Sequence, residues 1–199
     1  MSKIFYIIGP SSSGKDTLYK RILAEESLHL KAVTMYTTRP IRAKEQEGVE
    51  YHFVDDTTFQ ELQLQGKVIE SRTYDTVHGL WNYFTVADDE IMLEQYDYLM
   101  IGVVDSFLCT REYFGQNRVI PLYIQVEDGI RLQRALNREK KQKHPKYKEM
   151  CRRYLADLED FNQQKLQKSG INKRFKNYDL VKCTLELIQH IQDIQGDSK

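Results

Sequence analysis

An α/β fold, with a parallel β-sheet flanked by helices, is predicted by three observations. Apolar runs with the length and composition of buried strands occur at 4–8, 98–104 and 119–126. Segments with helical periodicity follow or separate these runs, as in sheets built from strand–helix–strand units with right-handed crossovers. A glycine- and serine-rich loop with the spacing of a phosphate-binding loop joins the first strand to the first helix.

Local signals place the first two helices. The first is predicted over 15–25, with Leu18 and Ile22 facing inward. The second is predicted to start at a capping box formed by Thr58 and Glu61 and to end near Gly66.

The later segments are predicted in the same way. The strand at 119–126 contains Pro121, which it tolerates only at an edge or an end of the sheet. The basic stretch 138–148 has no clear period and is expected to be a solvated, mobile loop. A closing amphipathic helix is predicted from apolar spacing at Leu180, Thr184, Leu187, Ile191 and Ile194.

Composition narrows the class of protein. The 199 residues include 29 basic and 29 acidic side chains, so no overall charge draws the chain to nucleic acid or to an anionic membrane. Cys109, Cys151 and Cys183 are scattered and lack C-x-x-C spacing, which indicates reduced, buried thiols. The apolar run near the N-terminus is too short for a signal peptide, and no segment reaches membrane-spanning length. We therefore expect a soluble, cytoplasmic protein.

The segment between the first strand and the first helix is the clearest functional signal. Gly9, Gly14 and Lys15 fit the pattern G-x-x-x-x-G-K, in which backbone N–H groups surround phosphate oxygens and the lysine reaches the outer phosphates. The alternative is a Ser/Gly-rich surface turn. The residues expected to contact phosphate are Gly9, Pro10, Ser11, Ser12, Ser13, Gly14 and Lys15.

The position that normally holds a metal-ligating Ser or Thr is Asp16, and Thr17 follows it. A carboxylate is a good Mg²⁺ ligand or could hold a coordinated water, so both residues are metal candidates.

Two arginines three residues apart, Arg39 and Arg42, precede Tyr51. The planar donors of arginine match phosphate oxygens in pairs, although an isolated arginine pair is usually a solvated surface feature. Together with the upstream loop, this pair suggests a pocket for a second phosphorylated molecule.

The run TTRPIR…EGVEYHFV, followed by Phe59, GKVIE at 66–70 and NYDL at 177–180, resembles the guanylate kinase family over nearly the whole chain. The resemblance implies a single domain spanning 1–199 with a P-loop NTPase-type parallel-sheet core. Its expected parts are the core at 1–33, 86–130 and 161–199, an acceptor nucleotide-binding insertion at 34–85 and a mobile lid at 131–160.

The resemblance implies ATP-dependent phosphoryl transfer to a nucleoside monophosphate, with GMP and ATP giving GDP and ADP and with Mg²⁺ as cofactor. Glu70 would read guanine by accepting hydrogen bonds from the ring N–H and the exocyclic amine. Asp105 would lie near the acceptor and the metal; it could also be a helix N-cap after the strand, and both roles could hold at once. The acceptor residues carried over are Arg39, Arg42, Tyr51, Glu70, Tyr83, Thr85 and Asp105.

On the donor side, the resemblance assigns Arg134 and Asn177 to ATP, although Asn177 can equally be a turn residue. Arg138 and Arg153 would clamp the transferred group, with Arg152 as the alternative to Arg153. The residues implied to be catalytic are Lys15, Arg39, Arg138 and Arg153, because transfer needs charge stabilisation.

Four features depart from the family pattern: Asp16, Met35 at a place where the family often has a base-contacting serine, a longer loop at 74–84, and an extended lid between Arg138 and Arg152. Within the longer loop, His78 and Trp81 either reshape the acceptor pocket or simply pack.

Two alternatives stay open. Ribose 1,5-bisphosphate phosphokinase has a similar Gly-Lys-Asp loop, so another phosphorylated acceptor is favoured by Asp16 and disfavoured by Glu70 with Thr85. A non-catalytic guanylate-kinase-like binding module is disfavoured because Gly9, Lys15 and the lid arginines persist.

Overall fold

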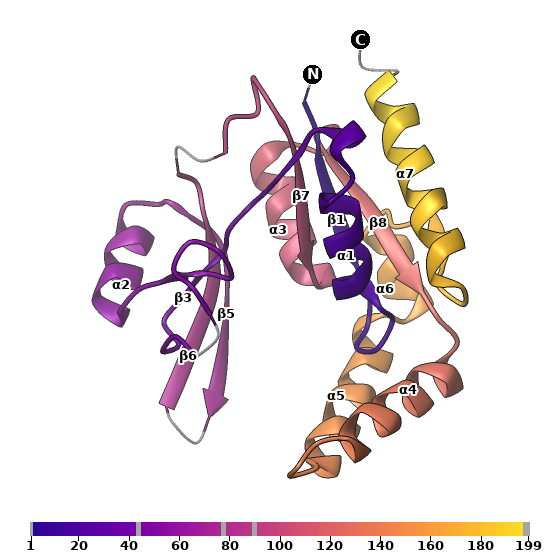
Figure 1. Ribbon diagram of the computed structural model, residues 1–199. Coiled ribbons are helices and arrows are strands. Elements are labelled where there is room, and N and C mark those ends of the chain that lie inside the picture. The colour runs from indigo at the N-terminus through magenta and orange to yellow at the C-terminus, as the bar shows by residue number, and fades with distance from the viewer. Residues whose placement is uncertain (1, 43–44, 77–78, 89–90, 197–199) are drawn as a thin grey trace.

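A five-stranded, fully parallel sheet forms the centre of the molecule in the computed structural model, which describes residues 2–42, 45–76, 79–88 and 91–196 (Figure 1). Along the sheet the strands are β2 (Leu30–Ala32), β7 (Asp97–Gly102), β1 (Ile4–Ile8), β8 (Val119–Gln125) and β9 (Arg174–Lys176). Every neighbouring pair is parallel, which confirms the predicted α/β fold.

Helices cover both faces of this sheet, and β1 alternates between them. Phe5 and Ile7 share a buried cluster with α1 (Lys15–Leu23) and α7 (Leu180–Gly196). Tyr6 lies in the opposite cluster with α3 (Val104–Phe114) and α6 (Gln163–Lys168). A strand buried on both faces reads as a continuous apolar run, which is why β1 was predictable. A short 3-10 helix, η1 (Glu26–Leu28), follows α1.

A second, four-stranded sheet lies beside the first (Figure 1). Its order is β4 (His52–Phe53), β3 (Tyr36–Thr37), β6 (Gly79–Val86) and β5 (Val68–Thr76). Helix α2 (Asp56–Leu64) covers it, with Phe59 against Phe84 at 4.5 Å between ring centroids. The segment expected to be a lengthened loop instead extends an antiparallel β5–β6 hairpin.

Two further helices, α4 (Asp128–Lys140) and α5 (Tyr147–Asp160), pack against each other at the edge where the loop after β1 emerges (Figure 1). The expectation of a loop over 138–148 is wrong at both ends. Residues 138–140 close α4 and 147–148 open α5, because the run of charged side chains hides the helical period of two largely exposed helices.

Several local predictions need correction. Helix α2 is capped by Asp55, whose side chain accepts from the Thr58 N–H at 2.8 Å, so the proposed box at Thr58 and Glu61 is wrong by one turn. The strand predicted to reach 104 ends at Gly102, and α3 starts two residues later. Pro121 meets the predicted condition: β9 pairs with β8 only from Tyr123 onward, so Pro121 lies at a local edge.

The cysteine prediction holds for one residue. Cys183 is buried in the core between α7 and the sheet, whereas Cys109 and Cys151 are exposed. Their helices present these positions to solvent, which spacing along the chain does not reveal.

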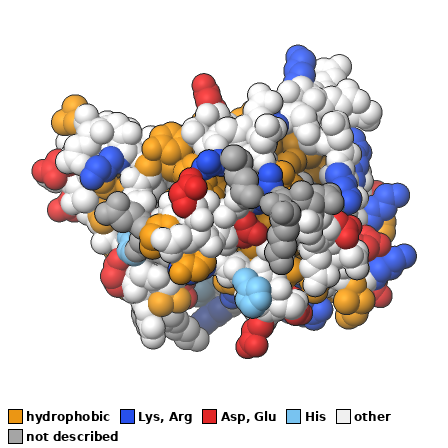
Figure 2. Space-filling model, turned by 90° about the horizontal axis from the view of Figure 1, so that it is seen from above, with side chains coloured by type: hydrophobic (Ala, Val, Ile, Leu, Met, Phe, Trp, Pro, Cys, Tyr) orange, Lys and Arg blue, Asp and Glu red, His pale blue; other side chains and the backbone are white. Residues whose placement is uncertain are grey.

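Side chains of both charges, acidic and basic, are present on the face seen in Figure 2. Among the residues that the structure describes, the helices are too short or too polar to cross a bilayer.

Candidate functional site

The loop between β1 and α1 has a backbone conformation that restricts which residues can occupy it. A Cβ on Gly9 would lie 2.8 Å from the Ser13 hydroxyl oxygen and 3.0 Å from the Ile124 carbonyl oxygen, so a side chain has no room there. Ser12 and Gly14 have positive φ angles of 62° and 89°. These turns bring the loop directly into the first turn of α1, whose unpaired N–H groups favour an anion.

Two hydroxyl groups in this loop are buried without a partner. Within the described part of the chain, the side-chain oxygens of Ser12 and Ser13 have no hydrogen-bond partner and are closed to solvent. An unsatisfied buried polar group is costly, so it calls for a ligand or an ordered water. The loop is therefore a candidate anion site on geometry alone.

A cleft of about 380 Å³ opens beside the loop. Its polar lining combines residues of the loop and α1 with two arginines of α4 and the segment after β9, and consists of Ser12, Lys15, Asp16, Thr17, Arg134, Arg138, Asn177 and Tyr178. The chain thus brings together all the donor-side residues predicted for the start of α1 and for α4. An anion in this cleft would meet three cationic side chains.

A smaller pocket of about 200 Å³ lies between the loop and the α4–α5 pair, lined by Ser11, Ser12, Arg138 and Arg153 among others. Both Arg152 and Arg153 are held by Glu149, each with a 2.7 Å contact. The hydrogen bond from Arg152, together with that from Arg153, lowers the pKa of Glu149 to about 2. Arg153, and not Arg152, reaches the pocket lining.

Asn177 joins the loop to the end of the sheet. Its side-chain amide is buried and donates to the Ser13 carbonyl at 2.8 Å. Its own carbonyl accepts from the Arg134 guanidinium at 3.0 Å. Asn177 therefore positions both the loop and a predicted ATP-side arginine.

Two residues that the sequence did not point out also hold the loop. Asp157 of α5 accepts from the Ser11 N–H at 2.8 Å, and Arg131 of α4 lies 3.6 Å from Asp157. Arg131 is only 2% exposed and also pairs with Asp128 at 2.6 Å. An arginine on a charged helix resembles a solvated residue in sequence, so only its burial reveals this role.

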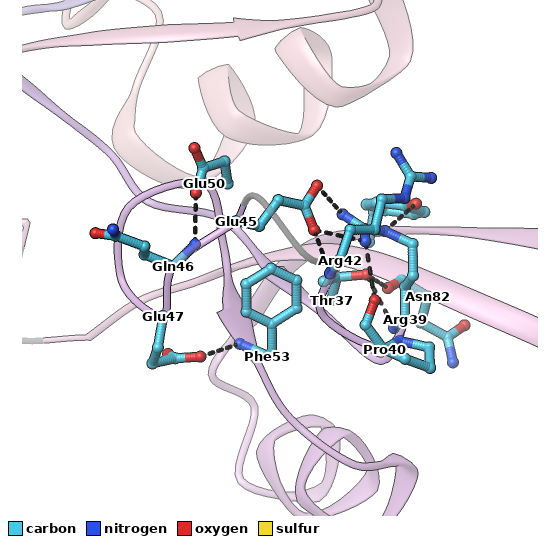
Figure 3. A network of polar contacts seen from close by, with 11 residues as sticks. Thr37, Arg39, Pro40, Arg42, Glu45, Gln46, Glu47, Glu50, Phe53 and Asn82 are labelled. Atoms are coloured by element: carbon cyan, nitrogen blue, oxygen red, sulfur yellow. Dashed lines mark hydrogen bonds and ion pairs between the residues drawn. The ribbon is translucent and has the colours of Figure 1, made fainter.

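The predicted acceptor residues gather on the second sheet. Arg39 is buried, and its guanidinium forms a two-point contact with Glu45 at 2.8 and 3.0 Å (Figure 3). It also donates to the Tyr83 hydroxyl at 3.1 Å. The Glu45 hydrogen bond raises the pKa of Arg39, and the same bond lowers the pKa of Glu45. A carboxylate thus occupies the fork that was predicted to hold a phosphate.

Aromatic rings frame this arginine. Tyr51 lies 5.5 Å from Arg39 and 5.5 Å from the Tyr83 ring in an edge-on arrangement. Burial raises the pKa of Tyr51, so its hydroxyl remains a proton donor. Arg42 is exposed, and its backbone N–H, not its guanidinium, donates to Glu45 at 2.9 Å. The Arg42 side chain is therefore presented to solvent.

Glu70, the carboxylate predicted to bind the guanine base, is buried near the start of β5. Thr85 donates its hydroxyl proton to one Glu70 oxygen at 2.9 Å, across a paired position of β5 and β6. Arg72, two residues further along β5, lies 3.2 Å from the other oxygen. Its guanidinium also lies 3.6 Å from the sulfur of Met35.

Asp105 lies in the first turn of α3, and the N-cap of this helix is Val103, so the alternative role as an N-cap is wrong. Its carboxylate is exposed and forms an ion pair with Lys165 of α6 at 3.0 Å. Trp81 is half-buried on β6 opposite Tyr74 of β5, and His78 lies outside the described residues.

Comparisons with known proteins agree with the sequence resemblance. Residues 1–91 match the family model described as Guanylate kinase. The chain is 41% identical over 78 residues to a guanylate kinase of Zymomonas mobilis, a match that covers 38% of this chain and 35% of the relative. It is 36% identical over 101 residues to one of Nitrosomonas europaea, which covers 50% of this chain and 48% of the relative. The chain thus spans about a third to a half of the length of these relatives.

The fold has a solved counterpart. The crystal structure of guanylate kinase from Anaplasma phagocytophilum superposes with a TM-score of 0.61 at 16% identity, covering 96% of this chain and 85% of that one. The resemblance to the guanylate kinase family and the α/β fold are therefore confirmed.

Proposed function

We propose that this chain is an ATP-dependent nucleoside monophosphate kinase whose acceptor is GMP. The observation that carries the proposal is the cleft beside the loop at 9–17, which is lined by Lys15, by two arginines of α4 and by Ser12, whose buried hydroxyl has no partner among the described residues. The family resemblance over residues 1–91 supplies the acceptor side, and the arrangement around Glu70 supports guanine.

ATP would bind with its phosphates along the loop. The N–H groups in the first turn of α1 would favour the phosphates at this end of the helix, and Lys15 would add a point charge. Arg134 is held by the Asn177 carbonyl at 3.0 Å, which fixes its direction beside the phosphates.

The start of α1 fits a magnesium ion. Asp16 is an exposed carboxylate that lines the same cleft as Lys15 and Thr17. Mg²⁺ is commonly bound through one or two carboxylates together with substrate phosphates, so a single acidic residue is sufficient. When bound, the ion would neutralise charge on the transferred group.

The acceptor phosphate would be held by the Arg42 guanidinium and the hydroxyls of Tyr51 and Tyr83. Arg39 would keep these groups in place, because most of its donors are already used by Glu45, Pro40 and Tyr83. A phosphate that takes the Arg39 fork directly must displace Glu45.

Transfer itself needs charge stabilisation more than proton transfer, because the acceptor oxygen already belongs to a phosphate. Arg138 and Arg153 line the pocket beside Ser11 and Ser12, which supports a role for them in approaching the moving phosphoryl group. Closing α4 and α5 over the loop would exclude water from it.

A coupled assay of ADP formation with GMP, AMP, CMP, UMP and ribose 1,5-bisphosphate tests the proposal. We expect GMP to react fastest and Lys15→Ala to lower turnover on the order of a hundredfold or more, the size typical of losing one charge-stabilising donor. Lys20→Ala is the control, because Lys20 is exposed in the last turn of α1.

Each alternative has its own outcome. Reaction with another acceptor but not with GMP would remove the guanine assignment and leave the kinase assignment standing. Calorimetry that detects no ATP binding by the wild-type protein would favour the non-catalytic binding module.

A further inference from the structure

Arg72 is a charged residue of the acceptor region that has no role in the proposed function. It is neither one of the residues proposed to hold the acceptor phosphate nor the carboxylate proposed to bind guanine. It lies two residues after Glu70 on β5, and side chains two apart share one face of a strand. Its neighbours on that face are Glu70 and, from the segment before β3, Met35. Arg72 therefore lies at the edge of the position where a base would meet Glu70.

The donors of Arg72 are poorly used in this arrangement. Its Nε is buried but makes no aligned hydrogen bond with any described residue, although Glu70 lies 3.2 Å away. One terminal nitrogen is 3.5 Å from the other Glu70 oxygen and 3.6 Å from the Met35 sulfur. A thioether is a weak acceptor, so the Nε–H has no aligned partner and this terminal nitrogen has only long contacts.

Glu70, by contrast, is fixed. Thr85 donates to it at 2.9 Å and both residues are buried, so the carboxylate cannot turn away from the acceptor region. A group that brings a strong acceptor to Arg72 and N–H donors to Glu70 would satisfy both charged residues at once. The 6-oxo edge of guanine is such a group: its oxygen accepts, and its ring N–H and amine donate.

We propose that Arg72 is a base-specificity residue of the acceptor site and donates to the 6-oxo oxygen of the purine while Glu70 accepts from the neighbouring N–H groups. The inference rests on the proposed function and extends it to a second base-reading side chain. Arginine commonly recognises guanine through its oxygen and ring nitrogen. Arg72 would thus supply the hydrogen-bond donor that the Met35 side chain lacks. Binding would require the guanidinium to turn from Glu70 and give up the 3.2 Å ion pair of its Nε together with two longer contacts, and the purine oxygen would become its new acceptor while the base N–H groups pair with Glu70.

Two pairs of substrates distinguish the contribution of Arg72 to base specificity from that of Glu70. The nucleotide 6-thio-GMP keeps the edge that faces Glu70 but replaces the oxygen with sulfur, a weak acceptor, so it reports on Arg72. IMP keeps the oxygen but lacks the exocyclic amine, so it reports on Glu70. The measured quantities are the kcat/KM ratios of GMP to 6-thio-GMP and of GMP to IMP, together with dissociation constants from calorimetry.

For the wild-type protein we expect GMP to exceed 6-thio-GMP by about 10- to 100-fold, the discrimination typical of one good arginine–guanine contact. Arg72→Met should bring this ratio close to unity and leave the GMP to IMP ratio unchanged. Arg72→Lys keeps a cation beside Glu70 and should retain part of the preference, which guards against loss of folding in the Met variant. Ser71→Ala, exposed on the opposite face of β5, is the control.

A GMP to 6-thio-GMP ratio that stays at the wild-type value in both Arg72 variants would overturn the inference. Faster GMP turnover in Arg72→Met would overturn it as well, because Arg72 would then be shielding Glu70 from the base. Absence of turnover with every nucleoside monophosphate would sink the proposed function itself, and this inference with it.

Discussion

At the scale of single residues, Gly14 is a loop position where both the backbone angle and the space available favour glycine. Its φ of +89° lies in the left-handed region, and a Cβ there would collide with the side-chain amide nitrogen of Asn177. Because that amide holds the Ser13 carbonyl, the collision would disturb the loop itself. Gly66 offers a matched comparison, since its φ is +67° and a Cβ there meets nothing within 4 Å.

We expect Gly66→Ala to lower the free energy of unfolding by about 1–2 kcal/mol, the usual cost of placing alanine in this conformation. Gly14→Ala should cost more than Gly66→Ala and should also weaken ATP binding. Urea unfolding and calorimetry measure the two effects. Equal stability losses with unchanged ATP affinity would show that the contact with Asn177 does not matter.

The sequence predicted loop residues better than it predicted their partners. Gly9, Gly14 and Lys15 are recognisable because the backbone requirement of a phosphate loop fixes their identity and spacing. The partners of Arg39 and the burial of Arg131 were missed. Glu45 follows Arg39 by six residues, outside the regular spacing of a helix or a strand, and burial depends on how α4 packs on the loop.

At the scale of elements, the strands buried on both faces were the predictable ones and the second sheet was not. The β5–β6 hairpin carries charged, hydroxyl and aromatic side chains on both faces, so its alternation does not separate apolar from polar residues. Helix α5 was not predicted for a similar reason, because a charged run precedes its apolar positions. Both elements pack on another element, α5 on α4 and β5 on α3, and a pattern within one segment does not report such contacts.

Helix α5 carries an ion triad whose pH dependence can be tested. Contacts with Arg152 and Arg153 lower the pKa of Glu149 to about 2, below its ordinary value of 4.5. A depressed pKa means that the triad stabilises the fold above the ordinary pKa and loses this effect as the pH falls through the folded value. The Glu149 side chain is 39% exposed, so solvent screening keeps the contribution small.

We expect Glu149→Gln to lower the free energy of unfolding by less than about 1 kcal/mol at neutral pH, and the difference from wild type to vanish as the pH falls from 4.5 towards 2. Glu159→Gln removes the same charge from an exposed position of the same helix and is the control. Urea unfolding at several pH values supplies the measurement. A difference that persists at the acid end would mean that the triad is not its source.

At the scale of the whole molecule, the phosphate loop is linked to both helices of the predicted lid. Ser11 of the loop donates to Asp157 of α5, and Asp157 lies beside the buried Arg131 of α4. We therefore expect a movement of α4 and α5 to be transmitted to the backbone proposed to hold ATP. The nearly whole-length structural likeness indicates the fold, but this link depends on individual charges that a fold does not specify.

A double-mutant cycle tests the link. Asp157→Ala removes the acceptor of the Ser11 N–H, and Arg131→Gln removes the buried cation, so each should destabilise the protein and weaken ATP binding. Because the two residues share one network, we expect a coupling energy of about 0.5–3 kcal/mol. The Ser11 amide should also exchange its hydrogen faster in both variants, whereas the control Glu159→Ala should leave it unchanged. Additive effects with wild-type exchange at Ser11 would mean that the lid helices and the loop behave independently, since an unshared contact transmits no energy between them.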